Sequence, residues 1–237
     1  MFLDKSLCGI MALKGGAAML TYETVKNSSA IQTYIVRADE SLGELGFTEH
    51  SFAHVVHVAE TAGYILETLG YEERTVELAK IAGYMHDIGN LVNRKEHSQS
   101  GAIMAWSILN DMDCDPGELA TIVTAIGNHD EGTGVPVNAV AAALILADKA
   151  DVRRSRVRNE NIAAFDIHDR VNYSVKKSVL KINEEKTIVK LKLTVDTKYG
   201  SVMDYFEIFM GRMILCRQAA EKLGLQFKLI INEQQLV

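Results

Sequence analysis

Several histidine and aspartate residues lie within apolar stretches of the sequence. His86 and Asp87 are adjacent in the segment GYMHDIGN, His54 lies one expected helix earlier, and Asp148 lies within the apolar run AALILADKAD. A buried carboxylate is costly unless it is paired or bound to a cation. The alternative is a polar network without a metal, but imidazole and carboxylate ligands from separate helices suit a divalent first-row metal better. The sequence therefore predicts a metal site with two open coordination positions.

The elements expected to position these residues are helices, with apolar residues at three- and four-residue intervals. From residue 21 to 69 the pattern is helical with a break at 43 to 48, and Thr48 is the expected start of the helix that carries His54. Later helices are expected at about 75 to 88, 98 to 109, 116 to 127 and 137 to 152. The last of these, VNAVAAALILADKADV, is the most apolar, so we expect it at the centre of a bundle.

The character of the sequence changes after residue 160. Alternating apolar and polar residues at 178 to 182 and 188 to 195 predict a β-hairpin. A helix at about 201 to 223 and a strand at 227 to 231 are expected to follow. We therefore expect a mainly α fold: a loosely packed segment at 1–20, a helical metal-binding domain at 21–160, and a small α+β subdomain at 161–237.

Composition limits the classes of function. The net charge of −6 argues against binding to duplex nucleic acid. No run approaches the about 20 apolar residues that a membrane span needs, and charged residues interrupt the apolar first twenty, so no membrane association is expected. Three widely spaced cysteines form neither a disulfide framework nor a zinc knuckle, which favours a reducing cytoplasm. The sequence is compatible with a homodimer.

The spacing of the candidate ligands resembles that of the HD superfamily of metal-dependent phosphohydrolases, whose pattern is a His, a His-Asp pair and a distant Asp. The matching residues are His54 in HVVHVA, His86-Asp87 in HDIG, and Asp148 in ILADKAD. His54 is preferred to His57 because the family's first His precedes a Val-Ala pair by four residues, as His54 precedes Val58-Ala59. The resemblance covers about residues 45 to 158 and implies a helical metal-binding domain.

Further histidines resemble those of the HD-GYP subset of this superfamily. His97 begins HSQSGAIM, and His129 lies in NHDEGTGVP. By this resemblance they complete a second metal site, with Asp87 as the bridge, so the expected cofactors are two divalent ions of Fe, Mn, Co, Ni or Zn. The alternative for both is a cap or loop histidine. His50 is a weaker candidate, because it lies one helical turn before His54.

The substrate expected from the resemblance is a nucleotide rather than a cyclic dinucleotide. Asn128 replaces a second His, Gly134-Val135-Pro136 replaces the GYP tripeptide, and Asn90 replaces the usual Lys of HDIGK. The element ADK followed by arginines is similar to HD proteins that act on nucleotides or dinucleotides. The expected substrate-binding residues are therefore Lys149, Arg153, Arg154, Arg158 and Asn90. The alternative for the arginines is a solvated helix end or pairing with acids of the second unit.

The resemblance implies hydrolysis of a phosphate ester or anhydride by metal-activated hydroxide, with Asp87 orienting the nucleophile. The partner is then a small phosphorylated molecule. The alternative is a regulatory protein that keeps the metal ligands and binds a nucleotide without hydrolysing it. His168-Asp169-Arg170, in FDIHDRVNY, is expected to be loop structure at the domain junction.

Overall fold

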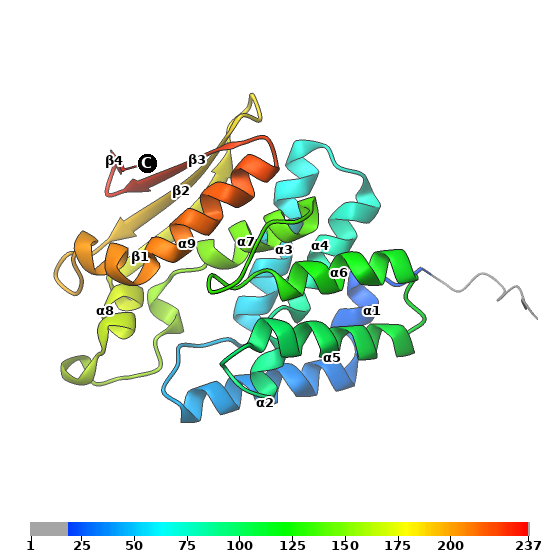
Figure 1. Cartoon of the computed structure of the whole chain (residues 1–237). Helices are drawn as coiled ribbons and strands as arrows, with labels where there is room; N and C mark the ends of the chain where they lie inside the picture. Colours follow the sequence, from blue (N-terminus) through cyan, green and yellow to red (C-terminus); the bar gives the residue numbers. More distant parts are fainter. Residues whose placement is uncertain (1–18, 237) are drawn as a thin grey trace, which may run out of the picture.

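The computed structural model describes residues 19–236 (Figure 1). The loosely packed segment expected at 1–20 lies outside the described residues except for its last two. Of these two, Leu20 is buried in the core, and its carbonyl accepts a hydrogen bond of 2.7 Å from the Arg74 guanidinium. Within the described range, no helix has both the length and the apolar character needed to span a membrane.

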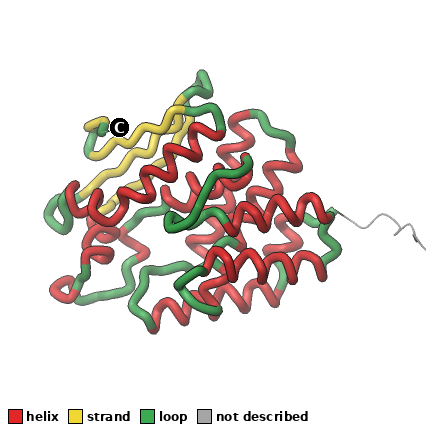
Figure 2. Tube along the Cα trace, in the orientation of Figure 1, coloured by secondary structure: helices red, strands yellow, loops and turns green. Residues whose placement is uncertain are grey.

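Helices make up most of the fold, and strands gather at one end of it (Figure 2). The helices are α1 (Tyr22–Lys26), α2 (Ser29–Glu44), α3 (Phe52–Leu69), α4 (Glu73–Met85), α5 (His97–Asp111), α6 (Pro116–Gly127), α7 (Ala139–Ala150), α8 (Ile167–Ser174) and α9 (Val202–Lys222). A short 3-10 helix, η1 (Ile88–Leu91), follows α4, and two more, η2 (Arg154–Arg156) and η3 (Ile162–Ala164), follow α7. The expected helical bundle with an α+β C-terminal part is confirmed.

Helix α7 lies at the centre of the bundle, as its apolar sequence predicts. Nearly all of its side chains are buried, and it contacts α3, α4, α6 and α9. The helix begins where Asn138 accepts a hydrogen bond from the Ala141 amide. It ends at Ala150 rather than 152, and Asp151 leaves the helical backbone conformation. Asp148 lies near this end, partly buried, at the wall of a cavity.

The C-terminal strands form one sheet in the order β1-β2-β3-β4. Strand β1 (Val175–Ile182) pairs antiparallel with β2 (Ile188–Val195), as the hairpin prediction requires, and β2 pairs parallel with β3 (Gln226–Ile231). A parallel pair needs a crossover connection, and α9 supplies it. In Figure 1, α9 lies along the sheet, and its contacts with α7 and β3 place it between the bundle and the strands.

Three boundaries differ from the sequence prediction. Helix α3 starts at Phe52, because Ser51 accepts the capping hydrogen bond from the Ala53 amide. The region around His168 is helix α8 rather than loop, since Asp166 caps it by accepting from the Asp169 amide. A two-residue strand, β4 (Gln234–Gln235), is too short to leave a periodic signal in the sequence.

Candidate metal centre

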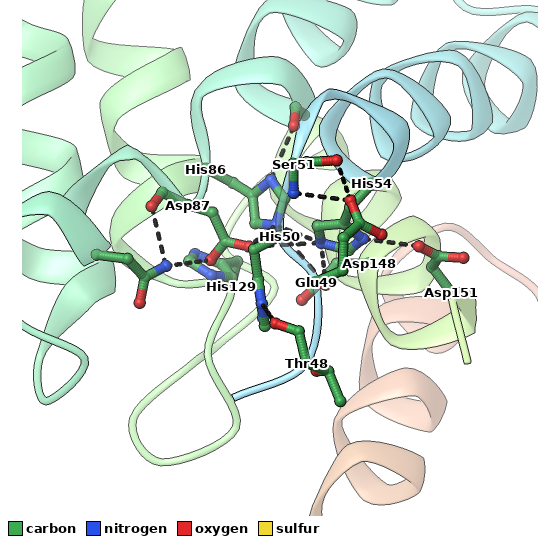
Figure 3. Close-up of polar contacts among 12 residues, drawn as sticks. Thr48, Glu49, His50, Ser51, His54, His86, Asp87, His129, Asp148 and Asp151 are labelled. Carbon is green, nitrogen blue, oxygen red and sulfur yellow. Dashed lines mark hydrogen bonds and ion pairs between the residues drawn. The ribbon is translucent and has the colours of Figure 1, made fainter. Parts of the chain in front are cut away.

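Residues from α3 to α7 meet at one buried point. His54 comes from α3, His97 begins α5, and Asp148 comes from α7. The remaining three follow the ends of helices: His86 and Asp87 after α4, and His129 after α6. Figure 3 shows five of these side chains, His54, His86, Asp87, His129 and Asp148, pointing toward one another. All six residues that the sequence proposed as principal ligands are thus gathered in space.

The first group of ligand atoms comprises one atom from each of His54, His86, Asp87 and Asp148. The Nε2 atoms of His54 and His86 are 3.3 Å apart, and Asp87 Oδ2 lies 3.4 and 3.1 Å from them. Asp148 Oδ1 lies 3.5 and 3.7 Å from the same two nitrogens. Four ligand atoms at about 2.1 Å from one metal ion in tetrahedral geometry are about 3.4 Å from each other. The measured distances lie near this value, and His54, His86 and Asp148 offer ligand atoms close enough together to hold one metal ion.

The second group lies on the other side of the Asp87 carboxylate. Its Oδ1 atom is 3.4 Å from His97 Nε2, which in turn is 3.2 Å from His129 Nε2. His86, Asp87 and His129 also offer ligand atoms close enough to hold an ion. One oxygen of the Asp87 carboxylate thus faces each group, so Asp87 could contribute a ligand atom to both if each held a metal ion.

The hydrogen bonds of the imidazole rings leave each Nε2 atom available as a ligand. The Nδ1 atoms of His86, His129 and His97 donate to backbone carbonyls at 2.8, 2.7 and 3.1 Å. His54 Nδ1 donates to the Asp151 carboxylate at 2.7 Å. Since these oxygens only accept, the proton stays on Nδ1 and the lone pair of Nε2 faces the cluster. The donor set therefore suits a divalent metal.

Burial and charge act in opposite directions on the pKa values of the cluster. Burial lowers the pKa of His86, but the Asp87 and Asp148 carboxylates outweigh it and raise the value to about 10. Burial alone would raise the pKa of Asp87, and the His86 charge reverses this, so its pKa lies well below the usual range. Burial holds the pKa of His129 well below its usual value. The cluster is thus rich in carboxylate charge that a cation can balance.

Two other predicted residues lie beside the cluster in different roles. The His50 ring packs edge-on against the His54 ring, with centroids 5.5 Å apart, and its Nδ1 donates to the Thr48 carbonyl. It lines the cavity but belongs to neither ligand group. Asn90 is buried, and its amide donates to Asp87 Oδ1 at 2.9 Å. Asn90 therefore helps to orient the Asp87 carboxylate, and its expected role in substrate binding stays a prediction.

Of the four predicted basic residues, Lys149 alone lines the cavity over the cluster. The three arginines are engaged elsewhere: Arg153 with Asp151 and Glu49, Arg154 with Tyr173 and Asp196, and Arg158 with Asp39. The structure places them there because α7 ends at Ala150 and the chain turns away from the helix axis. Arg154 pairs with Asp196 of the C-terminal part, as the alternative expects, whereas Arg153 and Arg158 pair with acidic residues of the helical part.

The cavity adjoining the cluster has a volume of about 360 Å³. Arg94, Arg156 and Arg212 contribute cations to its wall, and α8 contributes Asp169 and Asn172. Carboxylates outnumber lysine and arginine side chains along the wall, so the protein alone makes the cavity acidic. Two divalent cations would reverse this sign and make the cavity attractive to an anion of several charges.

Sequence reasoning missed three residues that matter here: Asp151 behind His54, Glu131, and Arg212 of α9. Glu131 contacts Lys149 at 2.6 Å and Arg212 at 2.8 Å. The spacing of Asp151, three positions after Asp148, was the one signal available for it. Arg212 carries no local pattern that distinguishes it from Arg217, the other arginine of α9.

The comparison with protein families identifies the domain. The family model of the HD domain matches residues 51–190, which is more than half of the chain and contains all six principal residues of the cluster. The chain belongs to the HD family. HD domains bind divalent metals, and the family supports a metal-dependent phosphohydrolase in general. The match runs past residue 160, and the division into domains at that position stays a prediction.

Two similar proteins place this HD domain among known sequences and structures. An uncharacterized protein of Methanocaldococcus jannaschii is 26% identical over 201 residues, which span 75% of this chain and 76% of that protein. A crystal structure of a predicted HD superfamily hydrolase from an uncultured Thermotogales bacterium shares 24% identity at a TM-score of 0.42. That comparison covers 52% of this chain and 67% of the other.

Proposed function

We propose that this HD protein hydrolyses a phosphate ester or anhydride of a nucleotide or dinucleotide-like substrate. The observation that carries the proposal is the double cluster, in which Asp87 presents Oδ2 to the histidines of one group and Oδ1 to His97 of the other. Sites with two metals commonly serve in-line displacement at phosphorus. The adjoining cavity, with cationic side chains in its wall, supports a small anionic substrate.

The ligands divide between two ions of Fe, Mn, Co, Ni or Zn. His54, His86 and Asp148 would hold one ion, His97 and His129 the other, and Asp87 both. When bound, the ions supply Lewis-acid charge that acidifies water and neutralises phosphoryl oxygens.

The protein's own residues bind the substrate and orient the attacking water. Lys149 Nζ, 2.7 Å from Asp148 Oδ2, is placed to donate to a phosphoryl oxygen next to the cluster. Arg94 Nη1, 4.0 Å from Asp87 Oδ1, offers a second donor on the other side. In the reaction a water oxygen bonds to phosphorus, the bond from phosphorus to the leaving oxygen breaks, and the water's protons pass to the products and solvent.

Metal analysis followed by a substrate panel tests this function. The purified protein should contain two transition-metal ions per chain by mass spectrometry. Nucleotides, dinucleotides and phosphomonoesters should then be assayed with Mn, Fe, Co and Ni. We expect hydrolysis by the wild type and by His57→Ala, whose side chain is exposed, and none by Asp87→Ala. Tight nucleotide binding without turnover under every metal would favour the regulatory alternative instead.

A further inference from the structure

Alternating charges extend from the ligand cluster toward the C-terminal subdomain. Asp148 Oδ2 contacts Lys149 Nζ at 2.7 Å, and the same Nζ lies 2.6 Å from Glu131 Oε2. The other oxygen of Glu131 accepts from Arg212 Nε at 2.8 Å. Lys149 comes from α7, Glu131 from the connection between α6 and α7, and Arg212 from α9. All four side chains line the cavity.

Lys149 and Arg212 together offer more hydrogen-bond donors and positive charge than the Glu131 carboxylate uses, so they can also bind an incoming anion. Lys149 is almost fully buried, with a side-chain exposure of 4%, and it is shared between two carboxylates. Arg212 uses only Nε on Glu131, and among the described residues no hydrogen bond from its two Nη groups is found. Its guanidinium is steadied by the Phe209 ring, 4.3 Å from the ring centroid. Arg212 therefore keeps most of its donor fork for a ligand in the cavity.

The positions of Lys149 and Arg212 relative to the ligand cluster determine which part of a substrate each of them can contact. Asp148 turns Oδ1 to the histidines and Oδ2 to Lys149, so Lys149 borders the place of the reacting phosphoryl group. Arg212 lies one carboxylate farther from the cluster, because it contacts the other oxygen of Glu131. Glu131 belongs to no helix or strand, so a change in its side-chain rotamer can vacate the space between the cations without moving an element.

We propose that Lys149 and Arg212 form a second anion subsite beside the metal centre, in which the Glu131 carboxylate is a placeholder that a substrate phosphoryl group displaces. The subsite takes the phosphoryl group next to the one attacked. It therefore selects substrates with a phosphoanhydride, such as nucleoside diphosphates and triphosphates or dinucleoside polyphosphates, over monophosphates. This inference rests on the proposed hydrolysis at the metal centre and narrows its substrate class.

Kinetics with two substrates test the subsite. ADP carries a neighbouring phosphoryl group, whereas p-nitrophenyl phosphate has one phosphoryl group only. We expect Arg212→Gln to raise the KM for ADP about tenfold or more while its KM for p-nitrophenyl phosphate changes less than twofold. Glu131→Gln should lower the KM for ADP severalfold, because the competing charge is gone. Arg217→Gln is the control, since Arg217 lies on the same helix and, within the part of the chain that the structure describes, pairs with exposed Glu221 alone.

The outcomes separate this subsite from a structural role. Melting temperatures should show that Arg212→Gln and Arg212→Lys remain folded, and the lysine variant should recover part of the ADP affinity. The proposal would be overturned if Arg212→Gln raised the KM for ADP and the KM for p-nitrophenyl phosphate by the same factor. An unchanged KM for ADP in this variant would overturn it as well.

A binding experiment distinguishes failure of the subsite from failure of the proposed function. If the wild type hydrolyses nothing, calorimetry with the metal-loaded protein still compares inorganic pyrophosphate with orthophosphate. Tighter binding of pyrophosphate that Arg212→Gln removes would support the subsite in a protein that binds without hydrolysis. Equal affinity for the two anions in the wild type would refute the subsite.

Discussion

Asp151 sets the orientation of the His54 imidazole, a candidate metal ligand, from outside the ligand group. Its Oδ2 atom accepts from His54 Nδ1 at 2.7 Å, and Arg153 and the Arg156 side chain lie against its carboxylate. A carboxylate in this position fixes the tautomer of the ring and raises the basicity of the ligating nitrogen. Asp151 is 2% exposed, so its charge acts without competition from solvent.

The Asp151→Asn variant should bind metal about 10 to 100 times more weakly at the group that contains His54. The amide keeps the size of the side chain but removes the charge that supports the imidazole. Metal titration by calorimetry should show one weakened site and one unchanged site. Asp196→Asn is the matched control, because Asp196 is a partly exposed surface carboxylate that pairs with Lys176. Weakening of both sites by the same factor would point to a general loss of structure.

Metal binding should release protons near neutral pH. The pKa of His86 is raised to about 10, so its imidazole holds a second proton at pH 7, and a metal ligand must lose it. Affinity therefore rises with pH, by up to about tenfold per pH unit for each proton released. Calorimetry in buffers of different ionisation enthalpy measures the number of protons released per metal ion bound. His57→Gln should leave it unchanged, and a value of zero in the wild type would contradict the expected linkage.

The residues that sequence reasoning selected and missed differ in one physical respect. Asp148 and the His86-Asp87 pair reveal themselves locally, because a polar group inside an apolar run needs a partner. Asp151 and Arg212 act through partners that lie 97 and 81 positions away, His54 and Glu131. Contacts of that kind depend on how helices are placed against each other, which no local pattern records.

At the scale of elements, close packing of α3 against α4 brings two ligands together. Gly83 of α4 faces the backbone of Ala59 in α3, where an added Cβ would lie 2.7 Å from the Ala59 Cα atom. Contacts that short with backbone require the helices to move apart. The glycine therefore sets the separation between α3, which carries His54, and α4, which His86 directly follows.

Gly83→Ala should destabilise the protein by about 1–3 kcal/mol and weaken metal binding at the group with His54 and His86. Thermal and urea unfolding of the metal-free protein measure the first effect, and metal titration the second. Gly127→Ala is the control: it lies at the end of α6, and its Cβ would meet Ala102 at 3.5 Å, an ordinary contact. Equal stability of the two variants would show that the α3–α4 separation is not fixed by Gly83.

Helices with strong local signals were predicted well, and those that depend on tertiary context were not. Helix α6 starts at Pro116 and ends at Gly127, as its proline and its apolar spacing predict. Helix α8 has eight residues that are mostly polar, and although its few apolar residues share one face, a segment this short is hard to tell from a loop that Asp166 begins. Helix α7 ends before the arginines, and its C-terminus therefore changed the expected place of three candidate substrate ligands.

At the scale of the whole molecule, the metal centre joins helices that the chain brings together from distant segments. Its ligands come from α3, α5 and α7 and from the residues after α4 and α6. Without a cation, the Asp87 and Asp148 carboxylates share one buried space with four inward-facing imidazoles, and a proton on His86 helps to balance the carboxylate charge. Metal binding should therefore contribute to the stability of the fold as well as to the reaction.

Removal of metal should lower the melting temperature of the wild type. A metal present at 100 times its Kd stabilises the folded state by about 2.7 kcal/mol for each site. For a chain of this size, each kcal/mol corresponds to about 2–4 °C, so one site should account for about 5–10 °C. Differential scanning calorimetry with chelator and then with added Mn or Fe measures the shift and its reversal. Asp87→Ala should show a much smaller shift, because Asp87 serves both ligand groups, whereas His57→Gln should behave as the wild type. An equal melting temperature of the wild type with and without metal would mean that the cluster is held by its own hydrogen bonds and not by cations.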